Sequence, residues 1–193
     1  MKLITFEIET PLGPVRRVGA LWDQPEEGGE ERAVDLALAF AARLRAEGDE
    51  PRYREYADFR LPQDMCALIA GGEPSLDAAR RALEYVAEGG EGVEGPSGER
   101  IVHPPAQVRL LAPVPRPASF RDFLTFERHR ADAARRRGEE IDPLWYEMPT
   151  CYKGNRLTII GPGEDLRWPR YTEKLDYELE LGMFIGKPGR DIA

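Results

Sequence analysis

Apolar positions near the N-terminus follow the two-residue period of a β-hairpin. The first run contains Leu3, Ile4, Phe6 and Ile8, and the second contains Val15, Val18, Ala20 and Trp22. A turn rich in proline and glycine at residues 11–14 separates the two runs. Because side chains alternate between the faces of a strand, two such runs joined by a turn predict an antiparallel pair.

Further segments of the first hundred residues have the spacing of helices. Residues 31–47 carry Ala and Leu at helical intervals, and Gly48 supplies a stop signal. Residues 62–70 form a shorter candidate that opens with proline. Residues 74–88 form a longer one, with Ser75 as its N-cap. No reactive side chains gather here, so we predict a small α+β support domain.

The second half alternates between strand signals, turns and one helix. The segments that predict strands are 108–111, 157–160 and 175–185. The last of these gives the strongest strand signal in the chain, because apolar and acidic residues alternate along it. Ser119 predicts the N-cap of a helix that runs to about residue 136. Asp122 then lies in the first turn, where the helix dipole favours a negative charge.

Charge is distributed unevenly along the 193 residues. The chain carries 27 Lys and Arg against 35 Asp and Glu, a formal net charge of −8. Residues 1–100 hold 12 basic and 21 acidic side chains, so the acidic excess lies in the first half. A glycine-rich stretch at residues 89–105 predicts a linker. We therefore predict two domains, at residues 1–105 and 106–193, in an α+β protein.

Composition narrows the class of protein. The acidic balance disfavours a nucleic-acid partner, because phosphate binding depends on positive charge. No run of about 18 apolar residues is present, so no membrane-spanning helix is expected. The two cysteines, Cys66 and Cys151, suggest neither a disulfide framework nor a thiolate zinc site. A reducing cytoplasm is therefore the expected location.

Glu178 and Glu180 form the most informative acidic pair. Residues two apart in a strand point to the same face, roughly 6–7 Å apart along the chain. A divalent cation between the two carboxylates would remove their repulsion, and hard oxygen donors favour Mg²⁺, Mn²⁺ or Ca²⁺ over zinc. The alternative is a solvated acidic face of a half-exposed strand.

Asp122 and His129 form a second candidate constellation. On one regular helix, residues seven apart share a face but lie about 10 Å apart along the axis, too far to bind one metal ion together. A metal at Asp122 with His129 as a base one substrate length away fits this spacing. The alternative is a solvated histidine in an Arg-rich helix. His103, which precedes two prolines, is expected to lie in a plain loop.

Basic and aromatic side chains give weaker signals for substrate binding. The arginines between residues 128 and 137, including Arg137, suit either a solvated helix face or an anchor for a substrate carboxylate. Tyr152 and Lys153 belong to an irregular aromatic segment at residues 144–155. That segment suits a pocket for a planar anion, although core packing explains its aromatic rings equally well.

Residues 108–192 resemble the fumarylacetoacetate hydrolase family. The likeness is densest in the stretches MPTCYKGN, TIIGPG and WPRYTEKLDYELELGMFIGKPGRDI. The preceding residues resemble the small N-terminal domain of bacterial members. The resemblance implies a mixed β-roll catalytic domain, commonly homodimeric.

The resemblance also implies roles for individual residues. Asp122, Glu178 and Glu180 match the ligands of one divalent metal, usually Mg²⁺, Mn²⁺ or Ca²⁺. His129 matches the histidine that activates water in the hydrolases. Tyr152 matches a substrate-contacting tyrosine, and Lys153 and Arg137 are further candidates for substrate contact.

The implied reaction is hydrolysis of a C–C bond in a 1,3-dicarbonyl or acylpyruvate-type acid through a metal-stabilised enolate. Hydration, dehydration and decarboxylation use the same chemistry in this family. A non-enzymatic metal or carboxylate binder is the alternative from another class.

The family pattern normally continues beyond Ala193. Its continuation supplies another metal-ligating aspartate, a lysine at the metal site and the glutamate that orients the histidine. The expected explanations are a complementing second chain, a fragment of a longer protein, or a repurposed one. A small-molecule substrate and a homo-oligomer or complementing chain are the expected partners.

Overall fold

The computed structural model describes residues 1–23 and 31–192, so Ala193, the end of the predicted second domain, lies outside the described residues. The chain divides into two compact units. The first combines Met1–Pro115 with the segment that starts at Ile160, and the second is Arg116–Ile159.

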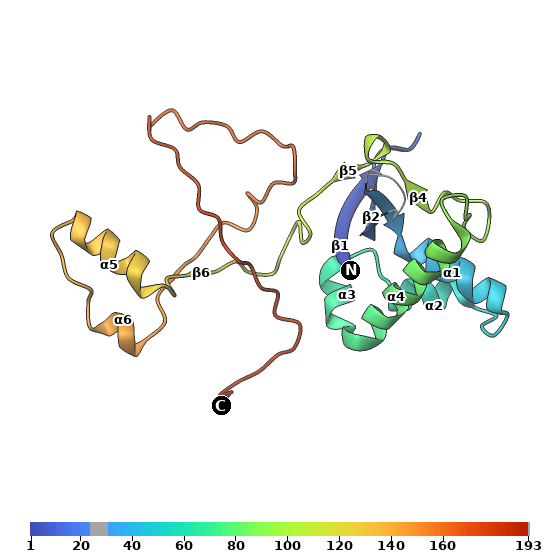
Figure 1. The fold of residues 1–193 in the computed structure, drawn as a ribbon, viewed down its shortest axis with the longest axis horizontal. Helices are drawn as coiled ribbons and strands as arrows, with labels where there is room; N and C mark the ends of the chain where they lie inside the picture. The colour runs from blue at the N-terminus through green and yellow to red at the C-terminus, as the bar shows by residue number, and fades with distance from the viewer. Residues whose placement is uncertain (24–30, 193) are drawn as a thin grey trace. The chain divides into compact units, whose positions relative to one another are not determined.

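A five-stranded antiparallel sheet forms the frame of the first unit (Figure 1). Its strands, in spatial order, are β4 (Val102–His103), β3 (Arg32–Asp35), β2 (Val15–Trp22), β1 (Lys2–Ile8) and β5 (Arg109–Leu110). Strands β1 and β2 pair over their length, with Thr5 opposite Val18. The predicted N-terminal hairpin is therefore confirmed.

Four helices follow β3 in the first unit, with the short 3₁₀ turn η1 (Pro105–Gln107) after β4. The helices are α1 (Leu36–Glu47), α2 (Tyr53–Arg60), α3 (Met65–Ala70) and α4 (Gly72–Gly89). The predicted stop at Gly48 is confirmed: this glycine has a φ of 79°, and its N–H donates to the carbonyl of Leu44. The predicted cap at Ser75 is wrong, because Ser75 is buried within α4 and Gly71 precedes that helix.

The core of the first unit joins the sheet to the helices. Val18 and Val34 of the sheet belong to one buried cluster with Leu36 and Phe40 of α1 and Ala79 of α4. A smaller cluster contains Ile4, Phe6 and Ala33, with Val108 and Leu110 packed against it. Removing these apolar side chains from water is the main stabilising term for this unit.

Two expectations for the first unit are corrected by strand pairing. Residues 32–35, predicted to be helical, pair with β2, and the helix begins only at Leu36. The predicted linker contains β4, which pairs with β3, so His103 lies on a buried strand rather than in a plain loop. Both corrections come from pairing with another strand, which the spacing of residues within the segment does not reveal.

The second unit contains a two-stranded antiparallel sheet and two helices. These elements are β6 (Asp122–Phe123), α5 (Glu127–Arg136), α6 (Leu144–Glu147) and β7 (Cys151–Tyr152). The helix predicted from Ser119 is therefore too long, and Asp122 lies on a strand. The reason is again pairing: β6 lies against β7, and the Leu124 N–H donates to the carbonyl of Thr150 at 3.3 Å.

The segment from Ile160 onward has neither helix nor strand assigned among its described residues, so the strand predicted at 175–185 is not observed. The strand predicted at 157–160 is also wrong. Asn155 explains the latter, because its side chain accepts from the N–H of Leu157 and its carbonyl accepts from that of Thr158. Such local bonds favour a turn over a strand.

Helices and strands are segregated along the chain, and the fold class is α+β, as predicted. Across the described part of the chain, no helix combines the length and apolar character needed to cross a membrane.

Candidate metal site

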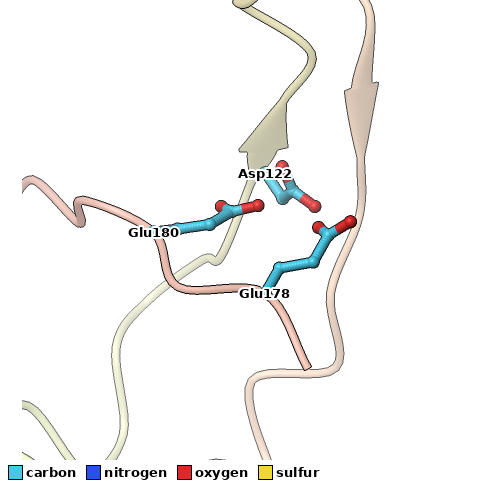
Figure 2. Close-up of side chains that lie close together, drawn as sticks. All are labelled: Asp122, Glu178 and Glu180. Carbon is cyan, nitrogen blue, oxygen red and sulfur yellow. The ribbon is translucent and has the colours of Figure 1, made fainter. Parts of the chain in front are cut away.

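Glu178 and Glu180 lie close enough to share one cation. Both belong to the segment that starts at Ile160, both side chains are exposed, and a carboxylate oxygen of one lies within 4.8 Å of an oxygen of the other. Figure 2 shows both side chains extending from one short stretch of backbone. The predicted proximity of the pair is thus observed, although the strand expected to create it is not.

The donor atoms of this pair fit a hard divalent cation. Carboxylate oxygens are the ligands that Mg²⁺ and Ca²⁺ prefer, and Mn²⁺ accepts the same set. Two exposed carboxylates this close also repel each other, which a cation between them would relieve. Exposed acidic groups are common without a metal, so the pair supplies a suitable donor set rather than a demonstrated site.

Asp122 and Tyr152 are brought together by the sheet of the second unit. They are direct partners in the β6–β7 ladder. Directly opposite residues of an antiparallel pair project to the same face, with Cβ atoms about 4.5–5.5 Å apart. Asp122 is half-buried and Tyr152 is 69% exposed. A predicted metal ligand and a predicted substrate contact therefore share one face, a relation that the sequence reading did not anticipate.

His129 lies in the first turn of α5 and is exposed. Asp122 is not on the same helix, so the separation of about 10 Å expected along one helix axis does not apply. Instead, a strand and a short connection separate the two residues.

Arg137 and Lys153 lie on exposed parts of the second unit. Arg137 follows α5, and its Nε donates to a carboxylate oxygen of Glu139 at 2.9 Å. Lys153 comes directly after β7, next to Tyr152. Because Arg137 already pairs with Glu139, it is less suited to bind a substrate carboxylate. Lys153, in contrast, adjoins the face shared by Asp122 and Tyr152.

The aromatic segment holds α6 against the start of α5. The indole N–H of Trp145 donates to the carbonyl of Leu124 at 3.1 Å, and the hydroxyl of Tyr146 donates to Glu127 at 2.7 Å. This hydrogen bond raises the pKa of Tyr146 above its ordinary value. The two rings meet edge to face with centroids 4.9 Å apart. These contacts show that packing accounts for Trp145 and Tyr146.

The sequence reading missed Glu127, which fixes Tyr146 to the first turn of α5. An acidic residue early in a helix was the available signal, since the helix dipole favours that position. The partner could not be read, because the bond spans 19 residues.

A comparison with protein-family models matches residues 118–193 to the model described as fumarylacetoacetate (FAA) hydrolase, C-terminal. This match contains Asp122, His129, Tyr152, Glu178 and Glu180.

Curated proteins give a consistent result. The chain is 29% identical over 135 residues to the human mitochondrial oxaloacetate tautomerase FAHD2A, which covers 70% of this chain and 37% of that protein. It is 27% identical over 136 residues to oxaloacetate tautomerase YisK of Bacillus subtilis, covering 69% and 42%. It is 25% identical over 179 residues to fumarylacetoacetase of Arabidopsis thaliana, covering 82% and 42%. The chain therefore spans less than half the length of these relatives.

Proposed function

Because the chain belongs to the fumarylacetoacetate hydrolase family through its residues 118–193, we propose that it acts on small 2-oxo or 1,3-dicarbonyl acids with the help of a divalent metal ion. The observation that carries this proposal is the Glu178–Glu180 pair, whose oxygens lie within 4.8 Å of each other inside the matched region. Carboxylate oxygens are the donors that such an ion prefers, and this pair would supply two of its ligands.

The family resemblance supplies the metal ligands in this proposal, which are Asp122, Glu178 and Glu180 of the matched region. Their carboxylates favour Mg²⁺, with Mn²⁺ or Ca²⁺ as alternatives. When bound, such an ion supplies Lewis acidity that polarises a substrate carbonyl and stabilises the negative charge that develops on its oxygen.

The remaining predicted residues would act on the substrate itself. His129 would take a proton from water, and the resulting hydroxide would attack the carbonyl carbon. Cleavage of the adjacent C–C bond would leave a carboxylic acid and a carbanion that is delocalised as an enolate and takes up a proton. Tyr152, on the same face as Asp122, would orient the substrate, with Lys153 and Arg137 as further contacts for its carboxylates.

A second candidate function is tautomerisation of a 2-oxo dicarboxylic acid. The names of two of the relatives favour it, since both are called oxaloacetate tautomerases. This reaction breaks a C–H bond and forms an O–H bond, or the reverse, and cleaves no C–C bond. It needs the same carboxylate ligands but does not need a base that activates water.

Metal binding tests the first step of the proposal. We expect calorimetric titration of the full chain with Mn²⁺ to show one site, and Glu178→Gln to weaken binding by at least about tenfold because a ligand charge is removed. Asp176→Asn is the matched control, since it removes an exposed charge from the same segment and leaves the pair intact. Equal weakening by both substitutions would mean that only the net charge of the segment matters.

Product analysis separates the two reactions. We expect nuclear magnetic resonance to show cleavage of an acylpyruvate by the wild-type protein and loss of that cleavage in His129→Ala. Interconversion of oxaloacetate tautomers that survives His129→Ala, without cleavage products, would favour the tautomerase. Full hydrolysis by His129→Ala would refute the role of His129 as the base.

We further propose a cytoplasmic location and an assembly with a second copy or a complementing chain. Both expectations rest on sequence composition and on the family. Light scattering after size-exclusion chromatography, with a search for a co-purifying chain, tests the assembly, and a monomer with no co-purifying chain would contradict it.

A further inference from the structure

The glutamate pair lies on a segment that contacts the sheet of the first unit near Ile160. Gly161 lies so close to β5 and the residues after it that an added Cβ would come 2.8 Å from the carbonyl oxygen of Leu110 and 2.9 Å from the Cα of Leu111. Both neighbours are backbone atoms, which cannot rotate away as a side chain could. Only glycine permits this approach.

A tight turn follows directly and fixes the direction of the segment. Pro162 and Gly163 occupy its centre, Gly163 has a φ of +76°, and the N–H of Glu164 donates to the carbonyl of Gly161 at 3.3 Å. Proline followed by a glycine with positive φ is the sequence signature of a type II turn. The side chain of Glu164 closes the turn by accepting from the N–H of Gly161 at 3.0 Å.

Arg109 of β5 connects this turn to the sheet. One of its terminal nitrogens lies 3.6 Å from a carboxylate oxygen of Glu164, and the other donates to Glu7 of β1 at 2.5 Å. The side chain of Glu7 is largely buried, so this ion pair fixes the position of the Arg109 guanidinium against the sheet. Glu7 also pairs with Arg16 of β2 at 3.7 Å.

A second contact lies beyond the glutamates. A Cβ added at Gly186 would come 3.2 Å from a methyl carbon of Ile69, the penultimate residue of α3. Glu178 and Glu180 therefore lie between two points, at Gly161 and at Gly186, where the same segment contacts the first unit. Fixing both ends of a chain segment reduces the number of conformations open to the residues between them.

We propose that Gly161, Glu164 and Arg109 are positioning residues that anchor the segment carrying Glu178 and Glu180 to the N-terminal sheet. The support domain thereby takes part in building the metal site, although it supplies no ligand to it. Ligands held in place before binding lose less conformational freedom on binding, so anchoring raises metal affinity. This consequence for the metal rests on the proposed function, whereas the anchoring itself does not.

The test compares matched variants of the full chain. Gly161→Ala places a methyl group against backbone, and Gly182→Ala is its control, because a Cβ there meets nothing within 4 Å. Glu164→Gln removes the charge that faces Arg109, and Arg16→Gln is its control on the other partner of Glu7. Glu164→Gln retains an oxygen acceptor, which keeps the proposal testable if Gly161→Ala fails to fold.

Two readouts are measured on each variant. The first is the backbone ¹⁵N order parameter at Glu178 and Glu180 without metal, and the second is calorimetric affinity for Mn²⁺. We expect Gly161→Ala to lower the order parameters from about 0.8 to below about 0.6. We expect the same variant to weaken Mn²⁺ binding about three- to tenfold. For Glu164→Gln we expect a loss of about two- to threefold, because exposed ion pairs contribute little.

The outcomes separate the anchoring from the metal site. Unchanged order parameters in Gly161→Ala and Glu164→Gln, or values already below about 0.6 in the wild type, would overturn the proposal. Lower order with unchanged Mn²⁺ affinity would support the anchoring and overturn its contribution to metal binding, because the contact would then be structural only. If the wild type binds no Mn²⁺, the proposed metal site fails, and the order parameters alone decide the anchoring.

Discussion

Replacing Asp35 should be among the most destabilising substitutions in the first unit, because this carboxylate has two tasks. It is fully buried at the junction of β3 and α1, where its Oδ1 accepts from the N–H of Leu38 at 3.1 Å and so caps the helix. Arg17 of β2 also donates to it through two nitrogens, at 2.5 and 3.0 Å.

The expected magnitude follows from these two contributions. Loss of an N-cap costs about 1 kcal/mol. Breaking a buried ion pair on one side costs about 3–5 kcal/mol, because the remaining charge stays desolvated. The side chain of Arg17 is 20% exposed, so water reaches it in part and the lower end applies. Asp35→Ala should therefore lower the free energy of unfolding by about 4 kcal/mol, a large share of the usual 5–15 kcal/mol.

Urea unfolding followed by far-ultraviolet circular dichroism measures this loss. Asp35→Asn should lower the free energy of unfolding by about 3 kcal/mol, because an amide oxygen still accepts from Leu38 while the charge opposite Arg17 is gone. Asp58→Ala, at an exposed position of α2, should change stability by less than about 0.5 kcal/mol. A loss below about 1.5 kcal/mol for Asp35→Ala would refute the reasoning.

The pH dependence at His103 and a matched pair of glycine substitutions give two further predictions for the same unit. Burial lowers the pKa of His103, whose Nε2 has no hydrogen-bond partner in the described structure; Asp35 opposes this shift, and the charges of Arg100 and Arg17 add to it. As the pH falls, His103 therefore takes up a proton in the unfolded chain before it does so in the folded one. The free energy of unfolding should keep its full value above about pH 6.5 and fall below that pH by up to about 1.4 kcal/mol per pH unit. His103→Gln should flatten this slope in urea titrations, and an equal slope in both proteins would contradict the assignment. Gly19→Ala should lower the free energy of unfolding by about 1–3 kcal/mol, because its Cβ would come 2.3 Å from the carbonyl oxygen of Val34. Gly92→Ala, where nothing lies within 4 Å, should be nearly neutral, and equal losses at both positions would contradict crowding as the cause at Gly19.

Elements with strong local signals were predictable from the sequence. The hairpin of β1 and β2 follows from two alternating runs and a turn, and the end of α1 follows from Gly48. Strands β3 and β4 were not predictable in this way. Each pairs with a strand outside its own segment, β4 with the distant β3, and β4 has only two residues. Short strands carry too few side chains to show a period, so their presence depends on the neighbour with which they pair.

Asp122 shows how one wrong element changes the reading of a site. Ser119 satisfied the rule for a helix N-cap, yet α5 begins only at Glu127. The N-cap rule describes which residues suit a helix start, and it does not exclude a competing strand partner such as β7. Placing Asp122 on β6 removes the supposed helical separation from His129 and creates the pairing with Tyr152, which no local pattern contained.

Glu178 and Glu180 show the opposite case: their predicted closeness is observed, although the strand predicted at residues 175–185 does not form. Tyr177, Leu179 and Leu181 are 85%, 95% and 90% exposed, so the apolar side of the alternation is unburied, and no ladder is assigned along the described part of this segment. The alternation of apolar and acidic residues indicates which side chains would share a face of a strand. The strand itself forms only when a neighbouring strand supplies hydrogen-bond partners. The carboxylates nevertheless lie within 4.8 Å of each other, because a spacing of two residues keeps both side chains within reach of one cation even without a ladder. The anchoring contacts at Gly161 and Gly186 then take on the restraint that a ladder would otherwise provide, which is why substitution at Gly161 is the most direct test of how this site is held.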